Sequence, residues 1–341
     1  MKISPVAVRR LRRFAPGVLA LAVVVGVFGF ALPRIASYED VLDVVRSLTG
    51  REIAVLLGAT VLNLITFAPP WMTALPRLGF TRAFVMTQST TAAGSALPGG
   101  EAVGAALAFG MLRAWGYGRG LVAAAVAVIS SFNLLVKVVF PVLAVAALLV
   151  TGSDVGTLGA IAGAASAAAL VLVTIVGLAL RRESSTLAVG RRLDPLFERV
   201  VALLRRTNRQ PLSQRLVHFR REVVGLLGRR WASLVAWTFV GHFTVFLVLL
   251  ATLWALDVSN VNVVQAFAAW SLTRLLTAIP ITPGGLGIVE LGLTAALVAA
   301  GAGDAQAVAA VLVYRALTWL PPILVGLPSL LFWRRLAKVG A

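Results

Sequence analysis

Long apolar runs constrain this sequence more than any other feature. A helix needs about 20 apolar residues to cross the hydrocarbon core of a bilayer. Runs of about this length or longer lie at 15–36, 52–75, 121–150, 155–180, 231–256 and 305–333. Charged residues make up only 13% of the chain, about half of the fraction in a typical soluble domain. We therefore predict an all-α polytopic membrane protein with six transmembrane helices.

Two more apolar segments are each interrupted by a Pro-Gly-Gly sequence, at 98–100 and at 283–285. Proline lacks the backbone N–H and glycine is conformationally permissive, so a helix does not continue through either sequence. Non-helical backbone at membrane depth is tolerated only inside protein or beside a water-filled cavity. Both interruptions therefore predict a re-entrant helical hairpin with a functional site at its tip.

The net charge of +18 would suit a nucleic-acid-binding protein, but the basic residues lie between the apolar runs, as the positive-inside rule requires. If each hairpin leaves the membrane on the side it entered, 25 of the 31 Lys and Arg residues share one face with both termini. If both segments crossed instead, the thirteen arginines of 181–230 would lie outside. We therefore exclude nucleic acid as a partner and predict a protein of the cytoplasmic membrane with both termini in the cytoplasm.

The order of these segments repeats along the chain. Residues 1–150 contain two spans, the hairpin broken at 98–100 and one span. Residues 151–341 contain a span, the basic loop 181–230, a span, the hairpin broken at 283–285 and a last span. Three crossings are an odd number, so the second repeat is inverted and the hairpins open to opposite faces. Inverted repeats with discontinuous helices are typical of secondary transporters, although a duplication retained only for packing gives the same pattern.

The basic loop contains two amphipathic stretches, at 193–204 and 216–227. They either lie along the anionic inner leaflet or belong to an ordinary loop whose charge only sets the topology. The first alternative makes an anionic lipid surface at the cytoplasmic face a partner of the protein.

Helices that restart after Gly-Gly expose backbone N–H groups and the positive end of a helix dipole. Glycine also lets a ligand approach the backbone closely. An anion such as a lipid phosphate is therefore expected to bind at the two breaks. The candidate substrate-binding residues there are Gly99, Gly100, Pro283, Gly284 and Gly285.

Five charged residues fall at membrane depth, where charges are costly, usually paired and often functional. They are Glu101, Lys137, Arg274, Glu290 and Arg315, and all five are candidate substrate-binding residues. Each carboxylate either stabilises the start of its helix or meets a cationic headgroup or a proton. The arginines either pair structurally with Glu290 or hold a lipid phosphate.

Other polar residues in the apolar runs are expected to be structural. We expect His242 to be a hydrogen-bonded packing residue and four amides to bond between helices: Asn63, Gln88, Asn133 and Gln265. The chain has no cysteine and only two histidines, which excludes thiolate and His-rich metal sites. Since the sequence offers no paired Asp, Ser/His dyad or P-loop, we expect no catalytic residues, no metal and no cofactor.

Three motifs in the second half resemble one family. They are Thr-Pro-Gly-Gly-Leu-Gly-Ile-Val-Glu at 282–290, Tyr-Arg-Ala-Leu-Thr at 314–318 and Pro-Pro-Ile-Leu-Val-Gly at 321–326. They resemble the lysylphosphatidylglycerol synthase transmembrane family, also called flippase-like, and the resemblance covers nearly the whole chain. It implies a membrane domain that moves lipids between leaflets, as the flippase half of the multiple peptide resistance factor does. Those larger proteins add a cytosolic aminoacyl-transferase domain; because nothing follows Ala341, we expect no synthase activity.

In the first half, Val103, Gly104 and Ala105 stand where the family often has a basic residue, so the resemblance does not imply a lysylated headgroup. We predict a translocase that moves the headgroup of a phospholipid or lipid-linked glycan between leaflets without hydrolysing ATP. Its partner is a membrane lipid, and a homo-oligomer is compatible with this role. The alternative is a non-transporting membrane scaffold subunit for an enzyme of envelope lipid or glycan synthesis.

Overall fold

The computed structural model describes most of the chain. The described residues are 30, 32–35, 37–96, 100–152, 182–203, 211–228, 230–276 and 282–338, together with 163, 164, 167, 170, 171 and 174. Every regular element among them is a helix. The predicted all-α class is therefore confirmed.

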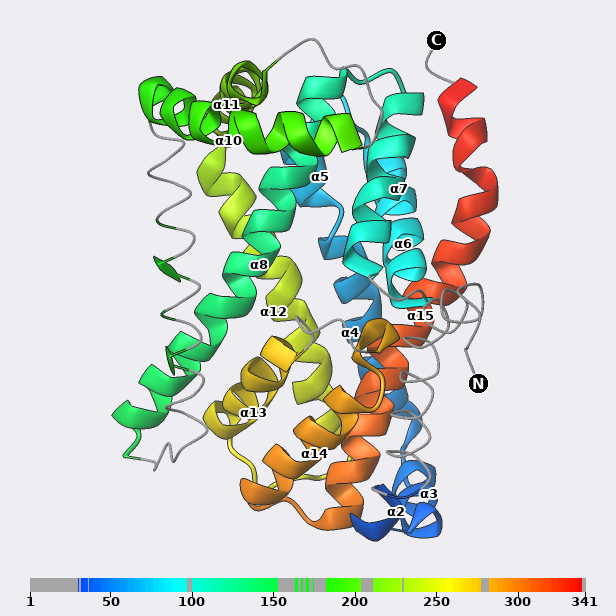
Figure 1. Cartoon of the computed structure of the whole chain (residues 1–341). Helices are drawn as coiled ribbons and strands as arrows, with labels where there is room; N and C mark the ends of the chain where they lie inside the picture. Colours follow the sequence, from blue (N-terminus) through cyan, green and yellow to red (C-terminus); the bar gives the residue numbers. More distant parts are fainter. Residues whose placement is uncertain are drawn as a thin grey trace, which may run out of the picture.

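Four stretches of helix are long and apolar enough to cross a membrane. They are α4 (Gly50–Thr66) together with α5 (Pro69–Ala74), α8 (Arg119–Val150), α12 (Trp231–Ala255) and α15 (Asp304–Lys338). Figure 1 shows them running from one end of the molecule to the other. These are four of the six predicted spans, and the membrane-protein class is confirmed. The spans predicted at 15–36 and 155–180 lie largely outside the described residues.

Two pairs of shorter helices flank the breaks. The first break is flanked by α6 (Phe80–Ala96) and α7 (Gly100–Ala114). The second is flanked by α13 (Val263–Leu276) and α14 (Ile288–Ala299), with the short 3-10 helix η2 (Pro283–Gly285) before α14. The four helices have 17, 15, 14 and 12 residues, fewer than the roughly 20 that a straight span needs. In Figure 1 the α6–α7 pair occupies one half of the molecule and the α13–α14 pair the other, with their broken ends near mid-height.

Glycines bring neighbouring helices of the first pair into backbone contact. A Cβ on Gly100 would lie 1.6 Å from the carbonyl oxygen of Gly94, where α7 starts beside the end of α6. On α15, a Cβ on Gly326 would lie 2.2 Å from the carbonyl oxygen of Gln88 in α6. Small residues allow this close packing in membranes, where van der Waals contact holds helices together. The first helix pair is therefore fixed both internally and against α15.

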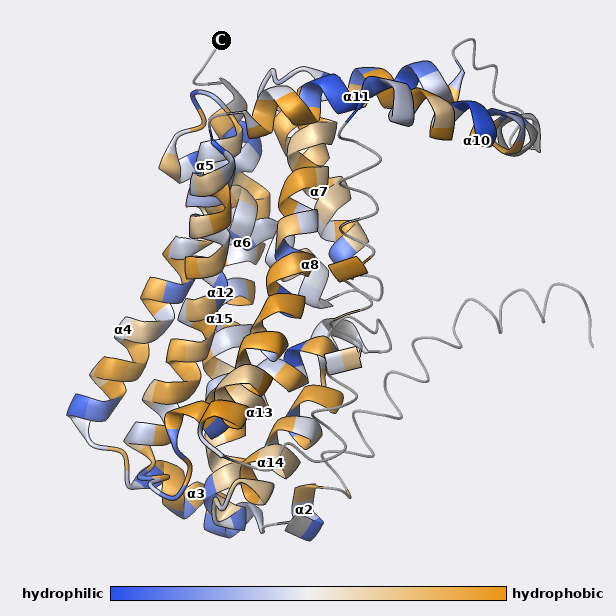
Figure 2. Cartoon of the chain, turned by 90° about the vertical axis from the view of Figure 1, so that its left-hand side faces the viewer, coloured by the Kyte–Doolittle hydropathy of each residue, from blue (hydrophilic) through white to orange (hydrophobic). Residues whose placement is uncertain are grey.

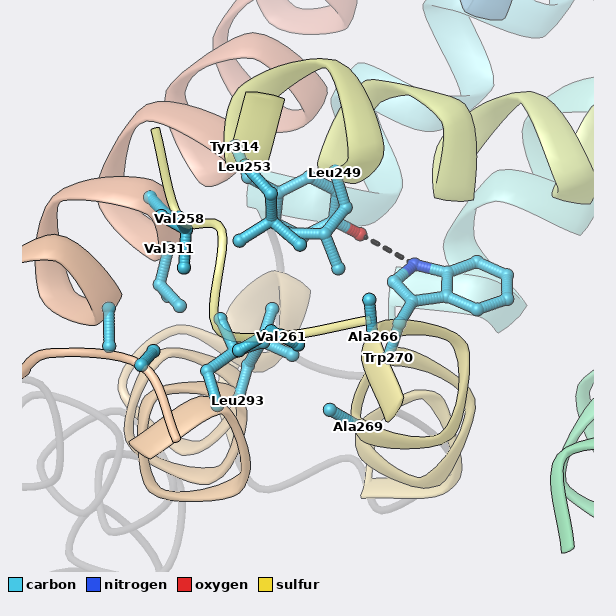
Figure 3. Packing of buried hydrophobic residues seen from close by; sticks show 14 of the residues in the cluster. Leu249, Leu253, Val258, Val261, Ala266, Ala269, Trp270, Leu293, Val311 and Tyr314 are labelled. Carbon is cyan, nitrogen blue, oxygen red and sulfur yellow. Dashed lines mark hydrogen bonds between the residues drawn. The ribbon is translucent and has the colours of Figure 1, made fainter. Parts of the chain in front are cut away.

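Two apolar clusters fill the two halves of the molecule. One joins α6, α7 and the first part of α8. The other joins α12 to α15, and Figure 3 shows Trp270 within it, with its indole Nε1 donating to the Tyr314 hydroxyl. The long helix α12 contributes Leu234 to the first cluster and Val245 to the second. A polar residue midway along α12 therefore lies at the boundary between the two cores.

The remaining helices lie at the two ends of the bundle. The helices α10 (Glu183–Leu203) and α11 (Leu212–Leu227) cross the end at which α15 finishes, whereas α2 (Leu32–Ile35) and α3 (Tyr38–Arg46) lie at the opposite end (Figure 1). Both amphipathic stretches predicted in the basic loop fall largely within α10 and α11. Figure 2 shows that this pair reaches beyond the bundle on one side, across the direction of the long helices.

Three of the four predicted interhelical amides are confirmed. Asn63 donates to a threonine hydroxyl of α12 at 3.2 Å, and Gln88 donates to a backbone carbonyl of α4 at 3.0 Å. Asn133 of α8 contacts α12, as described below. The prediction for Gln265 is wrong, because Gln265 and Asn262 exchange hydrogen bonds of 3.0 and 2.9 Å at the start of α13. Gln265 lies three residues after the capping position, so the exposed backbone N–H of Asn262 is its nearest partner.

Candidate functional site

Polar side chains from six helices meet where the two short helix pairs end. We call this place the junction. Its members are Glu101 (α7), Asn133 and Lys137 (α8), His242 (α12), Arg274 (α13), Glu290 (α14) and Arg315 (α15). They include all five charged residues that the sequence places at membrane depth. The fold gathers them because each lies beside a break or in the middle of a long helix, between the two apolar clusters.

The two breaks contact each other at the junction. Gly284 has a φ of 60°, and a Cβ there would lie 2.7 Å from Trp319 Nε1 and 3.5 Å from the carbonyl oxygen of Ser95. Only glycine suits this crowded, left-handed position. The second break therefore rests on the end of α6 and on α15. Within the described part of the chain, the buried Trp319 Nε1 and Thr282 Oγ1 have no hydrogen-bond partner.

Glu290 and Arg315 form a closed ion pair beside the second break. Arg315 Nε donates to Glu290 Oε1 at 2.7 Å, and its Nη2 donates to the Gly284 carbonyl at 2.9 Å. The other carboxylate oxygen accepts from the Gly287 N–H at 2.7 Å. The Glu290 side chain is only 1% exposed. The structural alternative for Glu290 is therefore realised with Arg315: the carboxylate caps α14 and ties it to α15.

Glu101 and Lys137 form an open ion pair beside the first break. Lys137 Nζ lies 2.5 Å from Glu101 Oε1. The lysine side chain is 13% exposed, whereas the glutamate side chain is 82% exposed. Within the described residues, Lys137 is the group to which Glu101 bonds. Exchange of this carboxylate for another anion at Lys137 would therefore break no helix cap.

The two pairs occupy matching places along the chain. In each case a glutamate in the first turn after a Pro-Gly-Gly break bonds to a cation on the next long helix. The second pair is closed by backbone contacts on both partners, and the first is held by one contact between side chains. The same arrangement thus provides a fixed pair and an exchangeable pair at one junction.

Arg274 extends the junction to α12 and α8 through a histidine. Its Nη2 lies 3.1 Å from His242 Nδ1, and His242 Nε2 lies 3.1 Å from Asn133 Oδ1. A guanidinium has only donors, so Nδ1 accepts and Nε2 carries the proton that it donates to Asn133. His242 is therefore neutral in this chain of hydrogen bonds. The Arg274 guanidinium also lies 5.7 Å from the ring centroid of Trp270, within the range of a cation–π contact.

His242 and Asn133 are site residues that the sequence did not single out. The expectation that His242 is hydrogen-bonded and buried is confirmed, since it is 3% exposed, but its partner is a cation of the junction. One signal was available for Asn133, which lies four residues before Lys137 and hence on the same face of its helix. No comparable spacing links His242 to Arg274, because the two lie on different helices.

The glycines at the breaks serve the fold in this structure. Gly100 faces the Gly94 carbonyl, and the Gly285 N–H donates to the Thr282 carbonyl at 3.1 Å in the turn. Gly99 lies outside the described residues, and Pro283 begins η2. Besides the charged side chains, the junction thus offers the buried donors of Trp319 and Thr282 as groups that an anionic ligand could contact.

The junction carries an excess of positive charge. Its ionised groups are three cations and two carboxylates, which leaves a formal charge of +1 when His242 is neutral. The undescribed stretches beside it, 97–99 and 277–281, contain no ionisable side chain. In low-dielectric surroundings an excess charge is costly. A ligand with one negative charge would therefore be stabilised here.

A separate pocket of about 260 Å³ lies at the end of α12 that is distant from α11. It is lined by Leu250, Leu253, Trp254, Asp257, Val258, Ser259, Val261 and Val263. It shares no residue with the junction, and one ionisable group lines it. We therefore locate the candidate site at the charged contacts of the junction and not at this pocket.

The helices that could cross a membrane and the charges gathered between them define an integral membrane protein with a polar site at depth. The model of the family described as lysylphosphatidylglycerol synthase TM region matches residues 17–326. The match includes both breaks and every member of the junction. The chain therefore belongs to this family, as its motifs predicted. A comparison with curated proteins found no match.

Proposed function

We propose that the protein is a lipid translocase, which moves the anionic headgroup of a phospholipid or lipid-linked glycan between the leaflets of the cytoplasmic membrane. The observation that carries the proposal is the junction, with a formal charge of +1 among helices that span the membrane. Charged groups at this depth usually line substrate or ion pathways. The description of the family as the TM region of a lysylphosphatidylglycerol synthase agrees with a lipid substrate.

The proposed topology has six spans and two re-entrant hairpins in an inverted repeat. Most of the described arginines lie toward the end of the bundle with α10, α11 and the end of α15, so the positive-inside rule assigns this end to the cytoplasm. We propose that both termini are also cytoplasmic. The α6–α7 pair then enters from the cytoplasm and the α13–α14 pair from the outside. Their tips meet where Gly284 approaches Ser95. This contact is the proposed barrier between the two sides of the membrane.

The headgroup phosphate would bind to Lys137 and Arg274. Lys137 is held by one exchangeable carboxylate, and Arg274 is linked through His242 to Asn133, which lies one turn before Lys137 on α8. A phosphate held by these two cations would neutralise the excess charge of the junction and release Glu101 from Lys137. Arg315 has no such role in the proposal, because its two contacts to Glu290 and Gly284 hold the second break in place.

The proposal is tested with the full chain in vesicles that contain fluorescent phosphatidylglycerol. Exchange between leaflets is followed by reducing the label in the outer leaflet. Lys137→Met and Arg274→Met each remove a charge-assisted hydrogen bond, worth about 1.5–3 kcal/mol. The proposal places this hydrogen bond in the transition state, in which the headgroup passes the junction. Its loss should then slow exchange between leaflets by about ten- to a hundredfold.

Arg46→Met is the matched control, because Arg46 lies on α3 and pairs with Asp43 at an exposed position. Its exchange rate should equal that of the unaltered protein. Normal exchange in both Lys137→Met and Arg274→Met, with the folded protein intact, would refute the headgroup site. Phosphatidylcholine, which carries no net charge, should exchange more slowly than phosphatidylglycerol in the unaltered protein.

A second candidate function is a membrane scaffold for an enzyme of envelope lipid or glycan synthesis. The observation that favours it is the reach of α10 and α11 beyond the bundle (Figure 2), which offers a surface to a second protein. This candidate predicts that leaflet exchange is equally slow in the unaltered protein and in the variants. It also predicts that an envelope-synthesis enzyme co-purifies with the chain.

A further inference from the structure

The helix pair α10–α11 is a fixed unit. Both carboxylate oxygens of Asp194 accept from Ser213, from its N–H at 3.0 Å and from its hydroxyl at 2.8 Å. A Cβ on Gly190 would lie 2.4 Å from the Ser213 Cα, so the two backbones touch. Arg221 Nη2 donates to Glu183 Oε1 at 2.7 Å. These contacts fix which face of α10 is turned toward α11.

The pair is also anchored to the bundle. Val223 and Leu226 of α11 are buried in the same apolar cluster as Ala124 of α8. Glu222 lies beside Gly120, where a Cβ would be 2.9 Å from the carboxylate oxygen. Because α11 is held on α8 and α10 is held on α11, neither helix can turn over without breaking these contacts.

One apolar face of α10 is left uncovered by this packing. Val189, Leu193 and Leu196 are 41%, 41% and 60% exposed. They are spaced at i, i+4 and i+7 and therefore form one stripe along the helix. The buried Thr186 and Gly190 lie on the neighbouring face, against α11. The stripe is thus a second apolar face, distinct from the one that builds the pair.

Basic side chains border the stripe. Arg192 is exposed and lies one turn from Leu196, and Arg182 is exposed and lies two turns before Val189. The whole segment 181–230 has thirteen arginines and four carboxylates. Of these carboxylates, Glu183 and Asp194 are engaged inside the pair. The backbone N–H of Ser213 lowers the pKa of Asp194 and keeps this carboxylate ionised. The outward surface is therefore basic.

We propose that α10 lies in the headgroup region of the cytoplasmic leaflet and binds anionic phospholipids. Val189, Leu193 and Leu196 would enter the boundary of the acyl chains, and Arg182 and Arg192 would contact lipid phosphates. An apolar stripe bordered by arginines is the pattern of helices that lie in a membrane interface. Both views of the fold agree with this orientation, because α10 crosses the direction of the spanning helices (Figures 1 and 2). This membrane contact does not depend on whether the protein is a translocase or a scaffold.

The absence of cysteine permits a direct test in the full chain. Leu196→Cys places an environment-sensitive fluorophore on the stripe. Ser184→Cys, an exposed position on the opposite face of α10, is the matched control. Each labelled protein is reconstituted in vesicles of phosphatidylcholine alone or of phosphatidylcholine with phosphatidylglycerol. We expect the label at 196 to report an apolar environment that is stronger with phosphatidylglycerol, and the label at 184 to stay aqueous.

The arginines are then removed together as Arg182→Gln with Arg192→Gln in the labelled Leu196→Cys protein. One arginine near an anionic surface changes the docking equilibrium by about fivefold, so the pair should lower it by roughly 25-fold and abolish the effect of phosphatidylglycerol. An aqueous label at 196 in both vesicles would overturn the proposal. The proposal would also be overturned if the label at 196 reported an apolar environment only after a soluble protein was added, because the stripe would then bind a protein. Leaflet exchange is measured separately, so failure here does not decide the translocase proposal.

Discussion

Substitution of either junction glutamate, Glu290 or Glu101, should lower the free energy of unfolding, but by unequal amounts. Glu290→Gln leaves Arg315, which is 14% exposed, without a carboxylate. Breaking a buried ion pair by removing one partner costs about 3–5 kcal/mol. The Gly284 carbonyl still accepts from Arg315 and the amide oxygen can replace one carboxylate oxygen, so we expect about 3 kcal/mol. Glu101→Gln also leaves a cation without a carboxylate, because Lys137 is 13% exposed, but the Glu101 side chain is 82% exposed and, unlike Glu290, holds no backbone N–H of the described residues. We therefore expect the smaller loss of a partly exposed pair, about 1 kcal/mol.

The assay is chemical unfolding of the purified full chain in mild detergent, with the free energy of unfolding as the readout. The double variant Glu290→Gln with Arg315→Met provides a second measure. It should be less destabilised than Glu290→Gln alone, because no unpaired charge remains buried. A Glu101→Gln variant that loses as much stability as Glu290→Gln would refute the distinction between the exchangeable and the fixed pair.

Close backbone contacts, the His242–Arg274 bond and the Asp194–Ser213 bonds can each be tested by substitution. Gly100→Ala would place a methyl group against the Gly94 carbonyl and should cost about 1–3 kcal/mol or more, measured as a lower thermal midpoint. Gly110→Ala, in open space within the same helix, should leave the midpoint unchanged or raise it, because alanine favours a helix more than glycine does. His242→Leu removes the acceptor for Arg274 and should slow leaflet exchange, with partial rescue by His242→Gln. Hydrogen bonds lower the folded pKa of Asp194, so its contribution to the α10–α11 contact is present above the ordinary carboxyl pKa and is lost as pH falls through the lowered value. Protection from hydrogen exchange at the start of α11, taken relative to the intrinsic exchange rate at each pH, should therefore decrease on acidification. Asp194→Asn should remove this pH dependence.

The positions of the long helices could be predicted from the sequence, because a helix that crosses lipid must be a continuous apolar segment of about 20 residues. Apolar runs gave the positions of α4–α5, α8, α12 and α15, and the Pro-Gly-Gly breaks separated the shorter helices. The exact ends were not predicted: the span expected from residue 52 begins at Gly50, where Thr49 and Glu52 form a capping box. Such a cap is a local interaction of the residue types at the helix start, and the apolar runs alone do not reveal it.

The pairing at the junction could not be predicted in the same way. Arg274 and Arg315 are both arginines at membrane depth, and either could reach Glu290 from sequence spacing alone. The choice depends on α12, which places His242 beside Arg274 and leaves Arg315 to Glu290. Gly100 presents a similar case, because a glycine at a helix start allows either an anion or a neighbouring backbone to come close. Only the position of the Gly94 carbonyl distinguishes the two roles.

The most direct test of the junction as a headgroup site is an experimental structure of the protein with a bound anionic phospholipid. We predict the phosphate between Lys137 Nζ and the Arg274 guanidinium, with Glu101 released from Lys137 and the Glu290–Arg315 pair unchanged. A phosphate bound elsewhere while the Glu101–Lys137 pair stays closed would contradict the proposed site.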